Sequence, residues 1–196
     1  MSVDSAVVLL LRDGKQDDKY ENLSKGLGLK VVQIPILSFD FINIDMVLEE
    51  IRNIEKYNGV VFTSQRAVEA FTKAVESDPN LEKSFLSKVC YVVGEATGAK
   101  VIEKLKWSPD IVLGASESGS ASSLVSVIAK GEVSGAKLLF PCGNLKRNEL
   151  EQGLKEHGIF LHTVTCYETK ARSDLDEAFK TSLFFASNDK GQSSKS

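Results

Sequence analysis

The chain has 196 residues, 42% of them hydrophobic, which is enough for one ordinary domain or two small ones with a real core. Its formal net charge of −3 at pH 7 argues against broad nucleic-acid binding, but a local basic pocket for an acidic small molecule stays open. The apolar run near the N-terminus is too short for a membrane span and follows no basic region. We therefore expect a cytoplasmic protein that contacts no membrane.

Cysteine and histidine usage indicates neither a disulfide framework nor a metal site. Cys90, Cys142 and Cys166 form an odd set without paired spacing, which suits a reducing compartment. His157 and His162 lie outside any zinc-binding pattern, so we expect solvated or capping roles for them. The sequence thus predicts no metal.

Strands and helices alternate along the chain. Apolar runs predict strands, and stretches with apolar residues at helical spacing predict helices. Strands are expected at 6–12, 30–37, 59–64, 88–94, 137–143 and 159–169. Helices are expected at 19–28, 42–57, 65–77, 95–107, 120–131 and 145–158. This alternation predicts a parallel sheet with helices on both faces.

Three segments are expected to contribute no regular element. SFDF (38–41) and the polar stretch 110–119 are expected to be connections. After residue 171 the alternation weakens, and LFF (183–185) stands as an apolar run with no helix after it. The polar end 187–196 has the composition of a disordered tail.

Three strand-to-helix joints share one design, in which an apolar strand ends in small or hydroxyl residues before a helix begins. The joints are FTSQRAV, VVGEATGA and PCGNLKR, the last opening a helix with two cations. In open α/β sheets, ligands bind at such carboxyl ends of strands, where backbone N–H groups can receive carboxylates. Each joint alone is better explained by N-caps and turns, whereas three on one rim favour a ligand crevice.

Other chemistry finds little support in the sequence. Neither a phosphate-binding loop nor a dinucleotide fingerprint is present, and no nucleophile elbow is found. Cys142 at a strand end lacks a histidine partner, so a small apolar turn residue is the better interpretation. Tyr167 near the end of the last strand is either a phenolic donor or an aromatic residue that closes the core.

Taken in order, these segments resemble the uroporphyrinogen-III synthase family. FTSQRAVEAF is similar to that family's Phe-Thr-Ser-Pro-Arg-Ala-Val segment, and YVVGEAT is similar to its Val-Gly-x-Ala-Thr segment. LLFPCGNLKR followed by VTCYET resembles the family's Pro-Cys-Gly-Asn-Leu-Lys-Arg and Val-x-Tyr-x-Thr segments. The ordered set covers nearly the whole chain up to about Arg172.

The resemblance implies an enzyme of tetrapyrrole (haem) biosynthesis, a lyase. The family closes linear hydroxymethylbilane into uroporphyrinogen III, with inversion of ring D through a spiro-pyrrolenine and loss of water. It uses no cofactor, works as a monomer, and has two flavodoxin-like α/β domains joined by a two-stranded linker. The substrate lies between those domains.

The resemblance also assigns roles to residues. Tyr167 falls on the position that the family places over the cleft, which makes it the candidate proton donor and catalytic residue. The substrate is rich in carboxylates, which the two cations of the third joint would help to hold unless they are only solvated. The residues expected to bind substrate are Thr63, Ser64, Arg66, Thr97, Asn144, Lys146 and Arg147.

Two departures from the family pattern define what remains open. Gln65 replaces the motif's proline, and the last residues replace several elements that would complete the family's first domain. We expect a partial first domain from 1–36 plus 168–196, a complete second domain from 37–167, and little activity in this chain. The alternatives are an inactive flavodoxin-like module that binds an anionic ligand, and a fragment without function.

Overall fold

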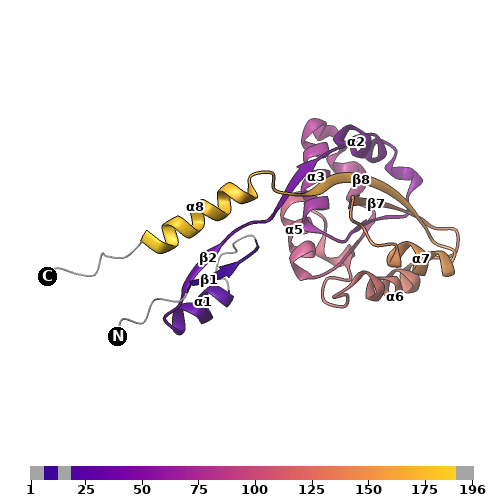
Figure 1. Cartoon of the computed structure of the whole chain (residues 1–196). Helices are drawn as coiled ribbons and strands as arrows, with labels where there is room; N and C mark the ends of the chain where they lie inside the picture. Colours follow the sequence, from indigo (N-terminus) through magenta and orange to yellow (C-terminus); the bar gives the residue numbers. More distant parts are fainter. Residues whose placement is uncertain (1–6, 13–18, 189–196) are drawn as a thin grey trace. The chain divides into compact units, whose positions relative to one another are not determined.

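The computed structural model describes residues 7–12 and 19–188 (Figure 1). Contacts between residues divide the chain into two compact units, one of Met1–Phe39 with Thr169–Ser196 and the other of Asp40–Glu168. The strands β3 (Leu37–Phe41) and β8 (Phe160–Ala171) each contain a position where the chain passes from one unit to the other. We refer to the first of these compact units as unit 1 and to the second as unit 2.

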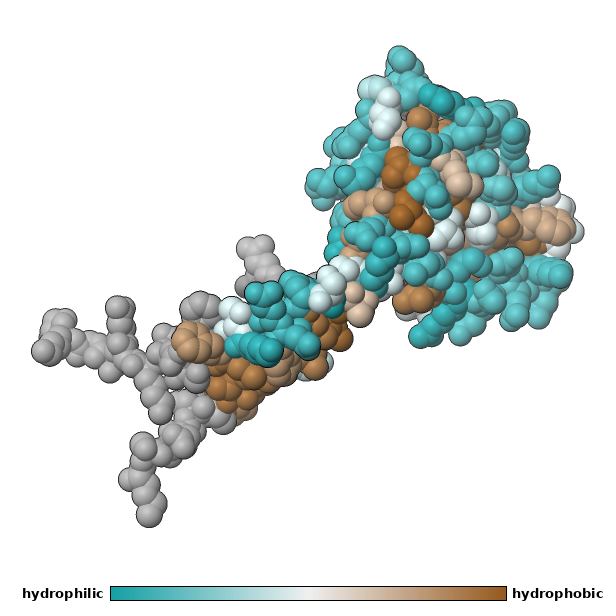
Figure 2. All heavy atoms as spheres, turned by 45° about the horizontal axis from the view of Figure 1, so that its top comes forward, coloured by the Kyte–Doolittle hydropathy of each residue, from teal (hydrophilic) through white to brown (hydrophobic). Residues whose placement is uncertain are grey.

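Unit 1 contains a small parallel sheet. Strand β1 (Val7–Leu10) pairs in parallel with β2 (Lys30–Gln33), and α1 (Lys19–Gly26) lies between them in the chain. The helix α8 (Leu175–Asn188) also belongs to unit 1. No residue of α1 is fully buried, and Figure 2 shows hydrophobic atoms on the surface of this unit. Its exposed large apolar residues include Leu11, Leu23, Leu27, Leu183 and Phe184.

Unit 2 is built on a sheet of six strands in the order β3-β8-β7-β4-β5-β6. The additional strands are β4 (Gly59–Phe62), β5 (Val89–Val92), β6 (Val112–Leu113) and β7 (Lys137–Gly143). From β8 to β6 every neighbouring pair is parallel. The carboxyl ends of these strands therefore meet at one edge of the sheet.

Helices cover both faces of this sheet (Figure 1). One face carries α2 (Ile44–Arg52), α3 (Gln65–Ser77) and α5 (Glu95–Leu105), and the other carries α6 (Ala121–Gly131) and α7 (Glu149–Glu156). Alternate strand residues point into the two cores, because successive side chains of a strand lie on opposite faces of the sheet. Val60 and Phe62 belong to one core and Val61 to the other. Short helical turns occur at Ile54–Lys56, Pro79–Leu81, Glu82–Phe85 and Pro109–Ile111. The predicted parallel sheet with helices on both faces is confirmed.

Aromatic side chains fill the larger of the two cores, which lies on the face covered by α2, α3 and α5. The Phe71 ring lies 5.4 Å from Phe62 and 5.3 Å from Phe85, both nearly edge to face. Trp107 stacks 4.8 Å from Phe85, and its Nε1–H donates to the Lys88 carbonyl at 2.7 Å. Edge-to-face pairs and a satisfied indole N–H are favourable arrangements for buried aromatic rings.

The structure corrects several predicted elements. SFDF belongs to β3, whereas the strand expected at 30–37 ends at Gln33. The connection at 110–119 contains the short edge strand β6. LFF lies inside α8, which runs to Asn188, because apolar residues at helical spacing continue from Leu175. The rest of the predicted disordered tail, 189–196, falls outside the described residues.

The helix after the third joint also begins later than expected. α7 starts at Glu149, so Lys146 and Arg147 lie in the preceding turn. Its first turn carries Glu149 and Glu151, which suit the positive end of a helix dipole better than two cations do. Within the described residues, no helix is long and apolar enough to cross a membrane.

Replacing Phe71 by alanine is expected to destabilise unit 2 by about 3–5 kcal/mol, because a fully buried ring would leave a cavity among three aromatic neighbours. Val133→Ala is the control, since Val133 is 73% exposed, and its effect should stay within about 0.5 kcal/mol. Urea unfolding followed by the fluorescence of Trp107, which lies in unit 2, measures both. Equal effects of the two substitutions would contradict this assignment of the core.

Candidate functional site

The first joint ends β4 and begins α3. Ser64 is extended (φ −154°, ψ 148°), and its Oγ accepts a hydrogen bond from the Ala67 N–H at 3.2 Å, so it is the N-cap of α3. Thr63 and Arg66 beside it are half-buried. The capping role inferred from sequence is confirmed, and the same hydroxyl makes a second contact.

That second contact joins the first joint to the last long strand. Ser64 Oγ lies 3.0 Å from the phenolic oxygen of Tyr167, at hydrogen-bond distance. The two residues are 103 positions apart in the chain. Tyr167 is half-buried, with its ring against the larger core and its hydroxyl at the rim. The position of the ring agrees with the interpretation of Tyr167 as an aromatic residue that closes the core, and its role as a phenolic donor stays a prediction.

A β-bulge places Tyr167 over the third joint. Along β7 and β8, Cys142 pairs with Thr165 but Gly143 pairs with Tyr167, so Cys166 is an extra residue. A Cβ on Gly143 would lie 2.5 Å from Tyr167 Cζ, closer than real Cβ contacts come. The ring therefore rests directly on the Gly143 backbone. Bulges commonly re-aim side chains in this way next to active sites.

The third joint is tied to the same residue by its main chain. The Asn144 N–H donates to the Tyr167 carbonyl at 3.1 Å, and the Lys146 N–H donates to Gly143 O at 3.2 Å. The Asn144 side chain is exposed. The first and third joints thus converge on Tyr167.

The second joint lies at the next strand. The Val93 N–H donates to Phe62 O at 3.0 Å, which ties the end of β5 to the end of β4. Gly94 (φ 79°) is the N-cap of α5, and Thr97 in the first turn is buried. In the described part of the chain, no hydrogen bond links Thr97 to Tyr167. The parallel sheet brings Thr97 to the same edge without joining it to the other candidates.

Two of the predicted backbone donors are already used. The sequence predicted that backbone N–H groups of the joints could receive carboxylates, but those of Gly94 and Asn144 donate to Ser118 O and Tyr167 O. Their hydrogens therefore point to protein carbonyls. The sequence could not indicate these two hydrogen bonds, because each acceptor lies far from its donor in the chain.

Each of two predicted cations has a carboxylate partner. Arg66 pairs with Glu69 at 3.0 Å, and Lys100, which sequence reasoning missed, contacts the same carboxylate. Partial burial acts to raise the pKa of Glu69, yet the hydrogen bonds from Lys100 and Arg66 hold it below its usual value. Lys146 pairs with Glu151 at 2.9 Å. Arg147 is exposed.

The cysteines are poor nucleophile candidates. Cys90, Cys142 and Cys166 are buried, and burial raises the pKa of each thiol, that of Cys166 to about 12. A thiol whose pKa lies far above neutrality carries almost no thiolate. The sequence-based interpretation of Cys142 as a small apolar turn residue agrees with this burial.

The histidines lie away from the joints. His157 is the C-cap of α7, and His162 Nε2 lies 3.1 Å from a Glu50 carboxylate oxygen. The described residues contain no group of three or more His, Cys, Asp or Glu that could hold a metal ion.

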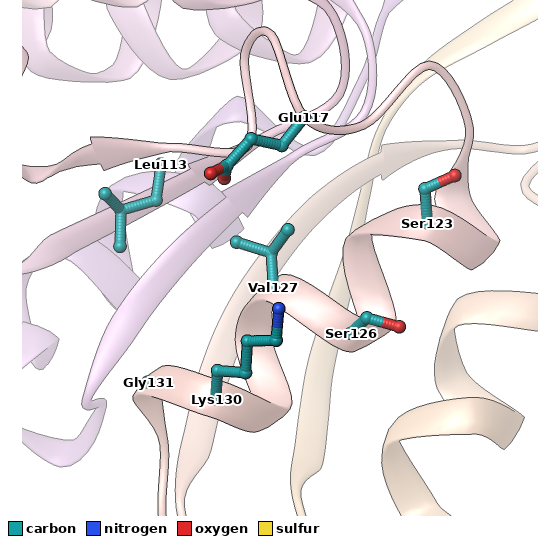
Figure 3. Close-up of a pocket in the computed structure, with 7 residues that line it drawn as sticks. All are labelled: Leu113, Glu117, Ser123, Ser126, Val127, Lys130 and Gly131. Carbon is teal, nitrogen blue, oxygen red and sulfur yellow. The ribbon is translucent and has the colours of Figure 1, made fainter.

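A pocket of about 740 Å³ lies elsewhere, between β6 and α6 (Figure 3). Leu113 and Glu117 form one side, and Val127 and Lys130 of α6 form the other. None of the residues predicted to bind substrate lines it. The candidate site therefore rests on the strand ends and on Tyr167.

Comparison with known proteins identifies the family. The family model described as Uroporphyrinogen-III synthase HemD matches residues 18–189. The chain belongs to the uroporphyrinogen-III synthase family. It is 29% identical over 179 residues to a uroporphyrinogen-III synthase of Saccharomyces cerevisiae, covering 86% of this chain and 64% of that protein. The chain thus spans less than two thirds of the length of this curated relative.

Solved structures share the fold. A mutant uroporphyrinogen III synthase from the extremely thermophilic bacterium Thermus thermophilus superposes with a TM-score of 0.60 at 13% identity, covering 86% of this chain and 64% of that one. A uroporphyrinogen-III synthetase from Helicobacter pylori gives a TM-score of 0.57 at 14% identity, covering 89% and 67%. The sequence-based recognition of the uroporphyrinogen-III synthase family is confirmed, and so is the mixed α/β fold.

Gly143→Ala is expected to displace the Tyr167 ring and to cost about 1–3 kcal/mol, because the new Cβ would overlap ring atoms. Gly119→Ala is the matched control, since a Cβ there meets nothing within 4 Å. Chemical denaturation gives the stability, and the NMR signals of the labelled Tyr167 ring report its position. If the Tyr167 ring signal has the same chemical shift in Gly143→Ala as in the wild type, the ring does not lie against Gly143.

Proposed function

We propose that the protein is a uroporphyrinogen-III synthase, a lyase of tetrapyrrole (haem) biosynthesis. In this proposal it closes hydroxymethylbilane into uroporphyrinogen III with inversion of ring D and loss of water. The observation that carries the proposal is Tyr167, bonded to Ser64 at 3.0 Å and seated on Gly143, so that one phenol meets two of the three joints. Membership of the family supports it.

In the proposed mechanism, Tyr167 is the proton donor. The pyrrole nitrogen supplies the electron pair that breaks the carbon–oxygen bond, and a proton from the phenol turns the departing hydroxide into water. The electron-poor carbon then bonds to the substituted carbon of ring D to form the spiro-pyrrolenine. The bond from that ring D carbon to the bridge of ring C breaks and re-forms at the unsubstituted α carbon of ring D, which inverts the ring. Loss of the proton from this carbon restores the pyrrole and returns a proton to the Tyr167 phenolate. Because the pyrrole itself supplies the electrons, we propose that neither a metal nor a cofactor is needed.

Ser64 orients that proton. Its oxygen accepts from the Ala67 N–H, so its own hydrogen is available for the Tyr167 oxygen. With the serine as donor, the tyrosine hydrogen points away from Ser64 and is available to the substrate. The N-cap of α3 would thus set the direction in which the phenol donates.

The cations are proposed to hold the substrate's carboxylates. Arg66 and Lys146 are paired with Glu69 and Glu151, so each carboxylate of the substrate would have to compete with a protein carboxylate. Arg147 is exposed and would add attraction. Hydrogen bonds are proposed from Thr63, Thr97 and the Asn144 side chain. Holding a flexible bilane in this way selects the closing geometry.

The proposed architecture extends the fold shown above. We propose two flavodoxin-like domains, from 1–36 plus 168–196 and from 37–167, with β3 and β8 as the two-stranded connection. The first of these has two strands in the described residues, fewer than a sheet usually needs to be stable by itself. We further propose a cytoplasmic monomer.

Uroporphyrinogen III is expected to bind this chain in competition with hydroxymethylbilane. Its affinity should fall as salt rises, because partly exposed carboxylate contacts are screened at high ionic strength. Anaerobic titration calorimetry at two salt concentrations measures this, with ATP as the control anion. Absence of tetrapyrrole binding, or tighter binding of ATP, would reject the proposed function.

Incubation of the 196-residue chain with hydroxymethylbilane is expected to yield mostly uroporphyrinogen I, the product of spontaneous closure, because the two-stranded sheet of unit 1 is only marginally stable. A small excess of isomer III over the enzyme-free background should remain. Tyr167→Phe should remove this excess, whereas Cys142→Ala should keep it. Chromatography of the oxidised porphyrin isomers provides the measurement.

The outcomes of this assay separate two claims. Isomer III at the background level in the wild-type chain would count against synthase activity. Mostly isomer III, together with slow hydrogen exchange in 7–12 and 30–33, would support the activity and show that unit 1 is more stable than its size implies.

A further inference from the structure

The loop between β6 and α6 contains a buried serine that no part of the proposed site uses. Ser118 is 1% exposed, and with Thr97 it makes up the buried polar side chains of the described residues. Its neighbour Glu117 lies in the same loop beside the pocket of Figure 3. Burying a hydroxyl costs free energy unless it is hydrogen-bonded, so its partners are informative.

Ser118 bonds to the chain on both sides of the end of β5. Its hydroxyl lies 2.9 Å from Val92 O and 2.6 Å from Gly114 O, and its own carbonyl accepts from the Gly94 N–H at 3.0 Å. The Ser118 N–H also donates to Gly114 O at 2.9 Å. One residue therefore holds Val92 and Gly94 while closing its own loop.

Gly114 makes this close approach feasible. Its φ of 91° lies in the region that favours glycine, and a Cβ there would lie 2.7 Å from Val92 O and 2.6 Å from Leu124 Cδ1. Farther along, a Cβ on Gly98 in α5 would come within 3.0 Å of the Ala115 Cβ. The loop is thus pressed against both the end of β5 and the helix that follows it.

The held segment is the second joint. Gly94 is the N-cap of α5, and its carbonyl accepts from the N–H groups of Thr97 and Gly98, both at 3.2 Å. A shift of Gly94 would therefore move the first turn of α5 and Thr97 with it. The Val93 N–H bond to Phe62 O ties the residue before Gly94 to the first joint, and Ser118 O accepts the hydrogen bond that Gly94 itself donates.

We propose that Ser118, with Gly114, is a positioning residue that fixes the second joint for tetrapyrrole binding. It acts through Gly94 and Thr97 and does not touch the ligand. This inference rests on the proposed function, because it assigns the second joint to the same site. It adds a residue from a segment that sequence reasoning treated as a plain connection.

The test compares three variants of the 196-residue chain. Ser118→Ala removes the hydroxyl that lies at hydrogen-bond distance from Val92 O and Gly114 O, Ser118→Thr keeps that hydroxyl, and Ser120→Ala is the matched control. Ser120 is the N-cap of α6 in the same loop, and its Oγ accepts from the Ser123 N–H, so its loss also destabilises the chain without reaching Gly94. Affinity for uroporphyrinogen III and hydrogen exchange over residues 93–98 are measured for each.

Ser118→Ala is expected to weaken uroporphyrinogen III binding about tenfold and to speed exchange over 93–98 by a similar factor, as loss of a buried hydrogen bond implies. Ser118→Thr should stay close to the wild type, and Ser120→Ala should leave both readouts unchanged. Equal exchange over 93–98 in Ser118→Ala and Ser120→Ala would overturn the proposal, whatever Ser118→Thr does. Equal affinities of Ser118→Ala and Ser120→Ala for uroporphyrinogen III would also overturn it.

The two proposals fail in different ways. If the wild-type chain does not bind uroporphyrinogen III, the proposed function is rejected, and the role of Ser118 in binding is rejected with it. The exchange comparison then still decides whether Ser118 holds the second joint. If the wild type binds and the variants do not differ from it, Ser118 alone is rejected.

Discussion

The candidate site depends on one close contact, the Tyr167 ring lying on the Gly143 backbone. The contact requires three features together: a residue without a side chain at the end of β7, one extra residue in β8, and a serine just after β4 at hydrogen-bond distance from the phenol. Each is ordinary alone, since glycines end strands and serines cap helices. Their combination places a polar group of the last strand above joints that come from earlier parts of the chain.

Ion pairs neutralise several cations at the joints. Arg66 and Lys100 share Glu69, and Lys146 is paired with Glu151. Partly exposed pairs of this kind contribute little to stability. They exchange partners at low cost, which suits the proposed ligand because it carries many carboxylates. A site with unpaired cations would bind anions more strongly and less selectively.

The sequence predicted most of the elements of unit 2 because hydrophobic periodicity is local information. The run of buried residues in β7 and the apolar face of α3 can be read directly from the chain. What it could not predict depends on partners distant in sequence. The bulge at Cys166, the acceptors of the Gly94 and Asn144 amides, and the burial of Ser118 are set by tertiary pairing. The helix at Leu175 was missed because LFF was treated as an isolated apolar run and not as part of a helical face.

The position of Trp107 has a practical consequence for studying this protein. It is the single tryptophan of the chain and lies in the aromatic core of unit 2, with its indole N–H bonded to Lys88 O. Indole emission depends on burial and hydrogen bonding, so its fluorescence reports on unit 2 alone. A far-ultraviolet signal averages over the helices and strands of both units. Where the two signals change at different denaturant concentrations, the units unfold separately and each has a free energy of its own.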